Sequence, residues 1–277
     1  KWDEINKIES DIQAGASIAI DGLSDTQRHH MFYSLVSKAQ KKAVYVSAND
    51  LQARKAYKNF QSLFGDGVIY FSPREKMLYD VEAKSHEQSY QRIECLNRLL
   101  SDDYTIAIFS WESLLDLYMP ADEFRNGFLY LKTGNSIKLG EVISKLIDMG
   151  YEREQQVEGR GQFAVRGGIL DVFPIQLQKP VRIELFDIEI DSIRVFETDS
   201  QRSVDTLEYI DIYPAREFMV SKENAGEIVK RVNNELKDMV SGMRDKAVID
   251  SLNTRFTEYI DKLKNAENFP GIDKFIP

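Results

Sequence analysis

The chain has 277 residues, 43% hydrophobic and 29% charged, an ordinary globular composition with enough apolar surface for two domains or one large one. Its formal net charge of -9 argues against a general role in coating nucleic acid, because such a chain repels a phosphate backbone on average, although a local basic patch is compatible with it. No apolar run approaches the ~20 residues of a membrane span, and the first residues, KWDEIN, have no apolar signal region and are expected to be helical already.

Candidate metal ligands are few and scattered. The single cysteine, Cys95, cannot form an internal disulfide, which favours a reducing cytoplasm. The histidines are His29, His30 and His86, and the two adjacent ones would point about 100° apart on a helix. We therefore expect a cytoplasmic chain without a metal or another cofactor.

The first part of the chain alternates helical and strand patterns. Apolar spacing predicts helices over 1–14, 25–40, 50–64, 86–100 and 112–117, and strands over 16–21, 43–47, 68–72 and 105–110. Ser85 and Gln88 have the spacing of a capping box before the fourth helix. Apolar strands that alternate with helices predict an α/β domain over residues 1–126, with a parallel sheet covered by helices on both faces.

The pattern changes near residues 125–127. A helix is predicted over 139–149, and strands over 181–186, 188–196 and 207–213, with a tight connection at Phe186-Asp187-Ile188. These elements predict a small α+β domain with an antiparallel sheet over 127–213. From residue 214 the chain is expected to form a charged, mostly helical section to residue 277, and we expect it to be a fragment of a longer protein.

The loop before the second predicted helix occupies the place of a phosphate-binding loop. A P-loop reads G-x-x-x-x-G-K-[ST], in which backbone amides, lysine and a hydroxyl hold phosphate and Mg²⁺. Gly22 matches the first glycine. The other three positions carry Gln27, Arg28 and His29. The sequence therefore predicts a degenerate P-loop that does not bind nucleotide.

The same loop has a structural explanation that needs no ligand. Ser24 and Gln27 form an S-x-x-Q capping box, and Asp25 suits the positive end of the helix dipole. The strand over 105–110 leads into Trp111-Glu112 rather than the paired acidic residues that would position Mg²⁺ and water.

Residues 159–164 spell G-x-G-x-x-A, a variant dinucleotide fingerprint. That motif works only between a strand and a helix, because the helix N-terminus supplies the phosphate site. Here the following residues lack helical spacing, and Pro174 lies close behind. Gly167-Gly168 suits a turn, a bulge or a close backbone approach, so a glycine-rich hairpin is the better interpretation.

Residues 151–205 contain six arginines but only one lysine, Lys179. Arginine favours protein interfaces because its planar fork pairs with carboxylates and stacks on aromatic rings. The segment also holds eleven acidic residues, so it is not a basic groove for nucleic acid. The alternative is a set of exposed cross-strand ion pairs, each worth under ~1 kcal/mol. The residues alone favour that alternative.

Three stretches carry a resemblance to a known family: residues 161–174 (GQFAVRGGILDVFP), 182–196 (RIELFDIEIDSIRVF) and 200–203 (SQRS). They closely resemble the N-terminal region of the bacterial transcription-repair coupling factor family (Mfd), which is similar to the excision-repair protein UvrB. The resemblance extends over essentially the whole chain, and Ser72–Asp80 also resembles a loop of that family.

The resemblance implies a three-part fold: a P-loop-like α/β domain, a small α+β domain, and a section from residue 214 that packs back on the first. It implies a degenerate P-loop and a docking surface on the small domain for UvrA, the damage-recognition ATPase. The family's docking residues, two arginines and an aromatic, correspond to Arg166, Arg182 and Phe186. Arginine and aromatic clusters are typical of interface hot spots.

The resemblance also implies a role in a longer protein. The full-length family member is an ATP-dependent DNA translocase that binds RNA polymerase and double-stranded DNA and can mask the docking surface. We expect this chain to be a non-catalytic, monomeric module without a membrane partner, which recruits UvrA to a damage-stalled polymerase. Two alternatives stay open: an active UvrB-like ATP-dependent repair enzyme, and a generic α/β interaction domain.

Overall fold

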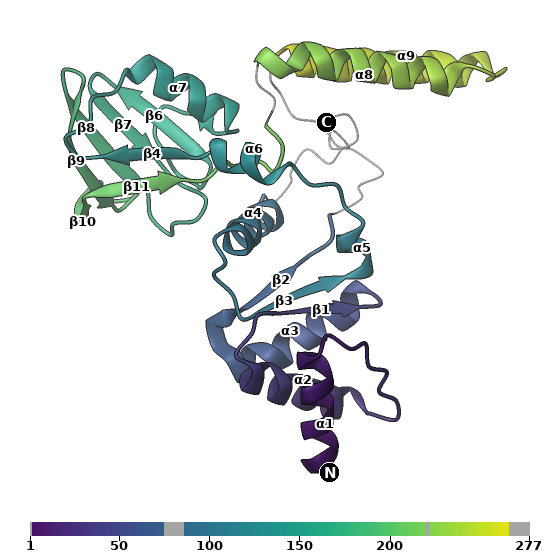
Figure 1. The fold of residues 1–277 in the computed structure, drawn as a ribbon. Coiled ribbons are helices and arrows are strands. Elements are labelled where there is room, and N and C mark those ends of the chain that lie inside the picture. Colours follow the sequence, from purple (N-terminus) through teal and green to yellow (C-terminus); the bar gives the residue numbers. More distant parts are fainter. Residues whose placement is uncertain (1, 75–85, 220–221, 266–277) are drawn as a thin grey trace. The chain divides into compact units, whose positions relative to one another are not determined.

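The structure is a computed structural model that describes residues 2–74, 86–219 and 222–265. It divides into two compact units (Figure 1). The first unit comprises residues 1–75 and 95–116, and the second comprises 76–94 and 117–277. Neither unit is a continuous stretch of sequence, and one boundary falls within helix α4, Glu87–Leu100.

The first unit is built on a parallel sheet of three strands in the order β1-β3-β2. The strands are β1 (Ala43–Ser47), β2 (Val68–Phe71) and β3 (Ile106–Ser110). The other elements are α1 (Trp2–Gln13), α2 (Asp25–Ala39), α3 (Asp50–Phe64), the 3₁₀ turn η1 (Gly65–Gly67) and α5 (Trp111–Leu114). α3 contacts all three strands because Ala53, Ala56 and Phe60 recur at helical spacing and are fully buried. Figure 1 shows α3 and α4 on opposite faces of the sheet, which confirms the α/β prediction.

The strand predicted over residues 16–21 is wrong. The described strands of this unit are β1, β2 and β3, and residues 16–21 have no main-chain partner in them. The side chains of Ile18 and Ile20 are 36% and 39% exposed. The apolar pattern suits a strand, but a strand also needs a partner distant in sequence, which local periodicity does not report.

The second unit contains a six-stranded sheet in the order β10-β9-β8-β7-β6-β5, antiparallel except for the β5–β6 pair. Its strands are β5 (Glu152–Arg153), β6 (Gln162–Arg166), β7 (Ile169–Val172), β8 (Val181–Phe186), β9 (Glu189–Phe196) and β10 (Ser203–Leu207). A separate two-stranded ribbon pairs β4 (Leu129–Lys132) with β11 (Tyr209–Ile212). The predicted antiparallel sheet is therefore confirmed, with one parallel pair at its edge.

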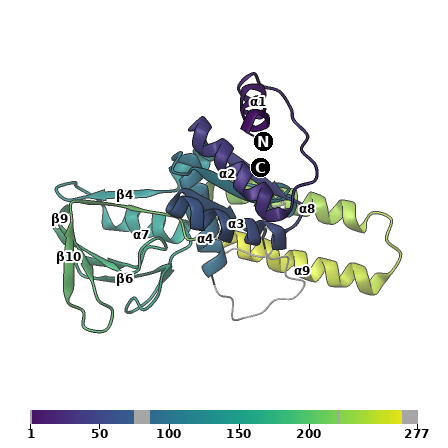
Figure 2. The same ribbon diagram turned by 90° about the horizontal axis from the view of Figure 1, so that it is seen from below.

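The helices of the second unit are α6 (Ala121–Asn126), α7 (Leu139–Asp148), α8 (Lys222–Val240) and α9 (Lys246–Lys264). The section predicted to be mostly helical contains the two helices α8 and α9, and Gly242, whose φ is +107°, lies between them. Figures 1 and 2 show α8 and α9 side by side. They share an apolar core that includes Ile228, Val232 and Phe256. No helix of the described chain combines the length and apolarity needed to cross a bilayer.

Two tight turns in the six-stranded sheet confirm sequence predictions. Gly167-Gly168 joins β6 to β7, and Gly167 has a φ of +61°. A Cβ added at Gly168 would lie 3.0 Å from the carbonyl oxygen of Leu185, so this glycine also permits a close backbone approach. Asp187, with a φ of +57°, turns β8 into β9. The G-x-G-x-x-A stretch thus leads from a turn into strand β6, and β7 rather than a helix follows it.

The first half of α4 is attached to the second unit by polar contacts. The guanidinium of Arg92 donates to both carboxylate oxygens of Glu217, at 3.1 Å for the Nη2–Oε2 contact, and the two side chains are only 2% and 8% exposed. Arg160, before β6, donates to Glu87, and Tyr90 donates to the carbonyl oxygen of Arg160 at 3.2 Å. These contacts hold residues 87–94 of α4 in the second unit.

The three-part division expected at residues 126 and 213, and the packing of the last section on the first, stay predictions. The capping box expected at Ser85 and Gln88 and most of the loop at 72–80 lie outside the described residues.

Candidate protein-docking site

The residues predicted to form a degenerate P-loop are engaged by the protein itself. Ser24 caps α2, with both hydrogen bonds of the capping box to Gln27 present, as the sequence predicted. Arg28 lies 3.5 Å from Asp25 in an exposed ion pair one helical turn apart. Gly22 has a φ of +77° and open space around its Cα, so it serves a turn. This loop therefore closes on its own side chains.

His29, at the position of the P-loop hydroxyl residue, is buried against the core of the first unit. Its Nδ1 lies 2.9 Å from the amide nitrogen of Asn59, and its Nε2 lies 3.3 Å from the hydroxyl of Tyr45. Its ring also packs edge-on against Phe60, with ring centroids 5.1 Å apart. Burial lowers the pKa of His29, opposed by the nearby carboxylate of Asp25. The side chain that would face Mg²⁺ in a P-loop here ties α2 to α3 and β1.

The two predicted docking arginines converge on one buried carboxylate. Arg182, on β8, lies directly opposite Asp171 on β7. Its Nε and Nη2 donate to the two carboxylate oxygens of Asp171 at 2.7 and 2.8 Å. Arg166, at the end of β6, donates through Nη2 to the same Oδ2 at 2.8 Å. Asp171 is only 1% exposed, so both guanidinium groups pair with a carboxylate that is buried in the sheet.

Arg182 is held more firmly than Arg166. Its Nη2 also donates to Gln201 at 2.8 Å, and its guanidinium carbon lies 4.5 Å from the centroid of the buried Phe196 ring. Hydrogen bonding to Asp171 raises the pKa of Arg182, opposed by burial. Its side chain is 17% exposed, whereas that of Arg166 is 51% exposed. One arginine is therefore fixed in the sheet and the other reaches into solvent.

Phe186 completes the predicted set on the same face of β8. Arg182, Glu184 and Phe186 alternate along the strand, so their side chains point to one side. Phe186 is 80% exposed at the β8–β9 turn, which is unusual for an aromatic side chain without a covering partner. The structure therefore brings Arg166 and Arg182 together on Asp171, from the two strands that flank β7, and Phe186 follows Arg182 along β8.

Asp171 was not identified from the sequence, and the alternative of exposed cross-strand ion pairs was right about the pairing but wrong about the exposure of this carboxylate. The arginines do pair across strands, as Arg194 does with Glu184 at 3.0 Å, but the Asp171 carboxylate is buried rather than exposed. A signal was present in the sequence, since Asp171 is a lone carboxylate within the apolar run Ile169–Phe173. An acidic residue in such a strand requires a buried cationic partner.

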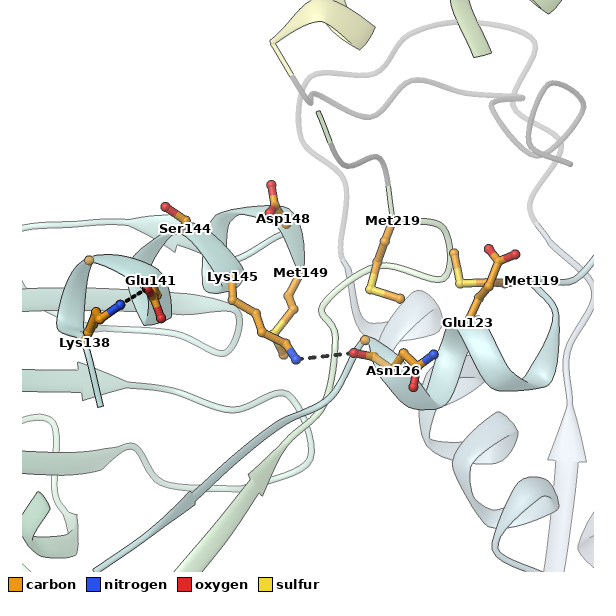
Figure 3. A pocket seen from close by; sticks show the side chains of 12 residues that line it. Met119, Glu123, Asn126, Lys138, Glu141, Ser144, Lys145, Asp148, Met149 and Met219 are labelled. Atoms are coloured by element: carbon orange, nitrogen blue, oxygen red, sulfur yellow. Dashed lines mark hydrogen bonds and ion pairs between the residues drawn. The ribbon is translucent and has the colours of Figure 1, made fainter. Parts of the chain in front are cut away.

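A cavity of about 910 Å³ lies elsewhere in the second unit, between α6 and α7 (Figure 3). Met119, Met149 and Met219 line it together with Lys145, whose Nζ donates to the carbonyl oxygen of Asn126 at 3.3 Å. Burial lowers the pKa of Lys145. None of the predicted docking residues lines this cavity. Across the described residues, no group of three or more His, Cys, Asp or Glu side chains could hold a metal ion.

Comparison with known proteins agrees with the sequence resemblance. The family model described as "UvrB interaction domain" matches residues 129–218. The chain is 28% identical over 256 residues to the transcription-repair-coupling factor of Bacillus subtilis (strain 168), which covers 92% of this chain and 22% of that protein. It is 29% identical over 248 residues to the protein of the same name from Staphylococcus aureus (strain Mu50), covering 88% and 21%.

These matches confirm the resemblance to the N-terminal region of transcription-repair-coupling factors, and the matched domain contains all three predicted docking residues. The chain spans about a fifth of the length of these relatives, 22% and 21%.

Proposed function

We propose that this chain is a non-catalytic docking module that binds the excision-repair protein UvrA through Arg166, Arg182 and Phe186. In the longer protein, it brings UvrA to an RNA polymerase stalled at DNA damage in the cytoplasm. The motor that moves along double-stranded DNA with ATP belongs to other parts of that protein. The printed name of the relatives, transcription-repair-coupling factor, supports this role.

The observation that carries the proposal is an exposed aromatic on the same strand as one of two arginines that share a buried carboxylate. Phe186 is 80% exposed, and Arg166 and Arg182 share one buried carboxylate on the adjoining strands. An exposed phenylalanine does little for the free chain, but in a pocket of a partner it removes apolar area from water. Arginines and aromatics of this kind dominate the binding energy of many interfaces.

We expect Arg182→Ala or Phe186→Ala to weaken the binding of UvrA by ~2 kcal/mol or more, because each removes a central anchor of the interface. Arg166→Ala should weaken it as well. The measurement is the affinity of purified UvrA for the immobilised 277-residue chain, at fixed salt, with thermal unfolding of each variant alongside. The thermal transition of Phe186→Ala should stay close to that of the wild type, because the side chain is exposed.

Two matched variants control for the loss of residue type. Arg153→Ala removes an exposed arginine from β5, at the edge of the sheet away from β8, and Tyr209→Ala removes an aromatic that is 55% exposed on β11. Both should bind UvrA like the wild type. If Arg182→Ala and Phe186→Ala bind as well as these controls do, the docking assignment is wrong.

A further inference from the structure

The two docking arginines carry the same charge and are drawn to the same oxygen, Asp171 Oδ2, at 2.8 Å each. Without a shared anion, two guanidinium groups so close would repel each other. Asp171 removes that conflict and fixes both groups. It comes from β7, the strand between the two that carry the arginines, so the sheet itself sets the spacing.

Several N–H groups of Arg166 and Arg182 are not used in the hydrogen bonds to Asp171. Arg182 uses Nε and Nη2 on Asp171 and Gln201, and Arg166 uses only Nη2. Within the described chain, no acceptor pairs with Nη1 of either arginine or with Nε of Arg166. A guanidinium that is already oriented loses less side-chain freedom when a partner binds these remaining donors.

We infer that Asp171 is a positioning residue of the docking site, which orients Arg166 and Arg182 before the partner arrives. It does not touch the partner, because it is only 1% exposed beneath the arginines. The remaining donors then receive a carboxylate of the partner, so that the arginine pair lies between two acidic groups. This inference rests on the proposed docking function and adds how the site is prepared.

The test is the variant Asp171→Asn, which keeps the size of the side chain and removes its charge. We expect the affinity for UvrA to fall by about tenfold or more, since charge-assisted pairs are the strong hydrogen bonds and tenfold corresponds to ~1.4 kcal/mol. Glu197→Gln is the matched control, because it removes a carboxylate of the same domain that pairs with Lys179 at 2.6 Å. That control should bind like the wild type.

Combining two substitutions shows whether Asp171 acts on UvrA binding through the arginines or independently of them. If Asp171 acts through the arginines, adding Asp171→Asn to Arg182→Ala should cost much less affinity than Asp171→Asn costs alone. Fully additive losses, or unchanged binding by Asp171→Asn while Arg182→Ala loses binding, would overturn the inference.

A second measurement needs neither UvrA nor a stable variant. In nuclear magnetic resonance spectra of the wild-type chain, the Nε–Hε group of Arg182 should exchange slowly with water and give a distinct signal, unlike that of the exposed Arg153. An Arg182 signal that exchanges as fast as that of Arg153 would overturn the inference even if Asp171→Asn fails to fold. If every arginine variant binds UvrA like the wild type, the proposed function is wrong. The exchange measurement would still test whether Asp171 positions Arg182.

Discussion

At the scale of single residues, two side chains that do not fit their local sequence pattern have specific partners in the fold. His29, where a P-loop would have a hydroxyl, has become part of the core, with Asn59 and Tyr45 as its polar partners. Asp171 stands in an apolar strand and has become the anchor of two arginines. The sequence shows that each residue departs from its surroundings, but only the fold shows which groups satisfy it.

His29 should make the stability of the first unit depend on pH. As oriented, the Asn59 amide donates to Nδ1, so the ring is neutral and has no place for a second proton. Its pKa is lowered from 6.5, so the folded chain binds this proton less readily than the unfolded chain. The contribution is therefore full above pH 6.5 and is lost as the pH falls below that value toward the folded pKa.

Denaturant unfolding between pH 7.5 and pH 5 checks this expectation, at about half-unit intervals. We expect His29→Gln to flatten the fall of the unfolding free energy on acidification, because glutamine does not titrate. His86→Gln, which removes an exposed histidine of the second unit, is the control and should keep the dependence on pH that His29 causes. A profile that His29→Gln leaves as steep as in the wild type would contradict the role given to this histidine.

At the scale of elements, local patterns predicted what local forces decide. The strand Ala43–Ser47 and the helix Asp50–Phe64 match the predicted ranges 43–47 and 50–64, because a short apolar run and helical apolar spacing are local signals. β10 was missed because its side chains are almost all exposed, so it shows no apolar alternation. β4 did carry a signal, since Leu129 and Leu131 alternate with exposed neighbours. Which strands pair with one another could not be predicted from local patterns, because the paired strands come from distant parts of the chain.

The turn between β6 and β7 offers a test of element stability. Gly167→Ala should lower the free energy of unfolding by ~1 kcal/mol, because a residue with a Cβ is strained at its φ of +61°. No neighbouring atom lies within 4 Å of the added Cβ, so the loss reports backbone strain alone. Gly167→Asn should lose less, because asparagine enters this region more readily. Equal losses for alanine and asparagine in urea unfolding would contradict this explanation.

At the scale of the whole molecule, the order of helix and strand patterns along the chain predicted an α/β part and a second, sheet-rich part, and the structure agrees. The docking site was not predictable from composition or spacing. Arg166, Arg182 and Phe186 were identified by resemblance, while the residues alone favoured surface ion pairs. A docking surface depends on which side chains share a face, and that depends on sheet register.

The module as a whole should not bind ATP. Gln27 is engaged in the cap of α2 and His29 in the core, so neither is placed to hold phosphate or Mg²⁺. Calorimetric titration of ATP with Mg²⁺ into the chain should give no binding heat, and titration of UvrA should give a saturable signal. A micromolar affinity for ATP would revive the alternative of an active UvrB-like enzyme.

The second unit is not continuous in sequence, and this affects where a minimal fragment for testing the proposed docking should begin. The matched domain covers residues 129–218, yet Glu217 pairs with Arg92 on α4, and the carbonyl oxygen of Arg160 accepts from Tyr90 on the same helix. A clone limited to the matched domain would keep the three proposed docking residues but would lack α4, which supplies the partners of Glu217 and Arg160. A soluble fragment should therefore begin before α4, or supply that helix as a separate peptide.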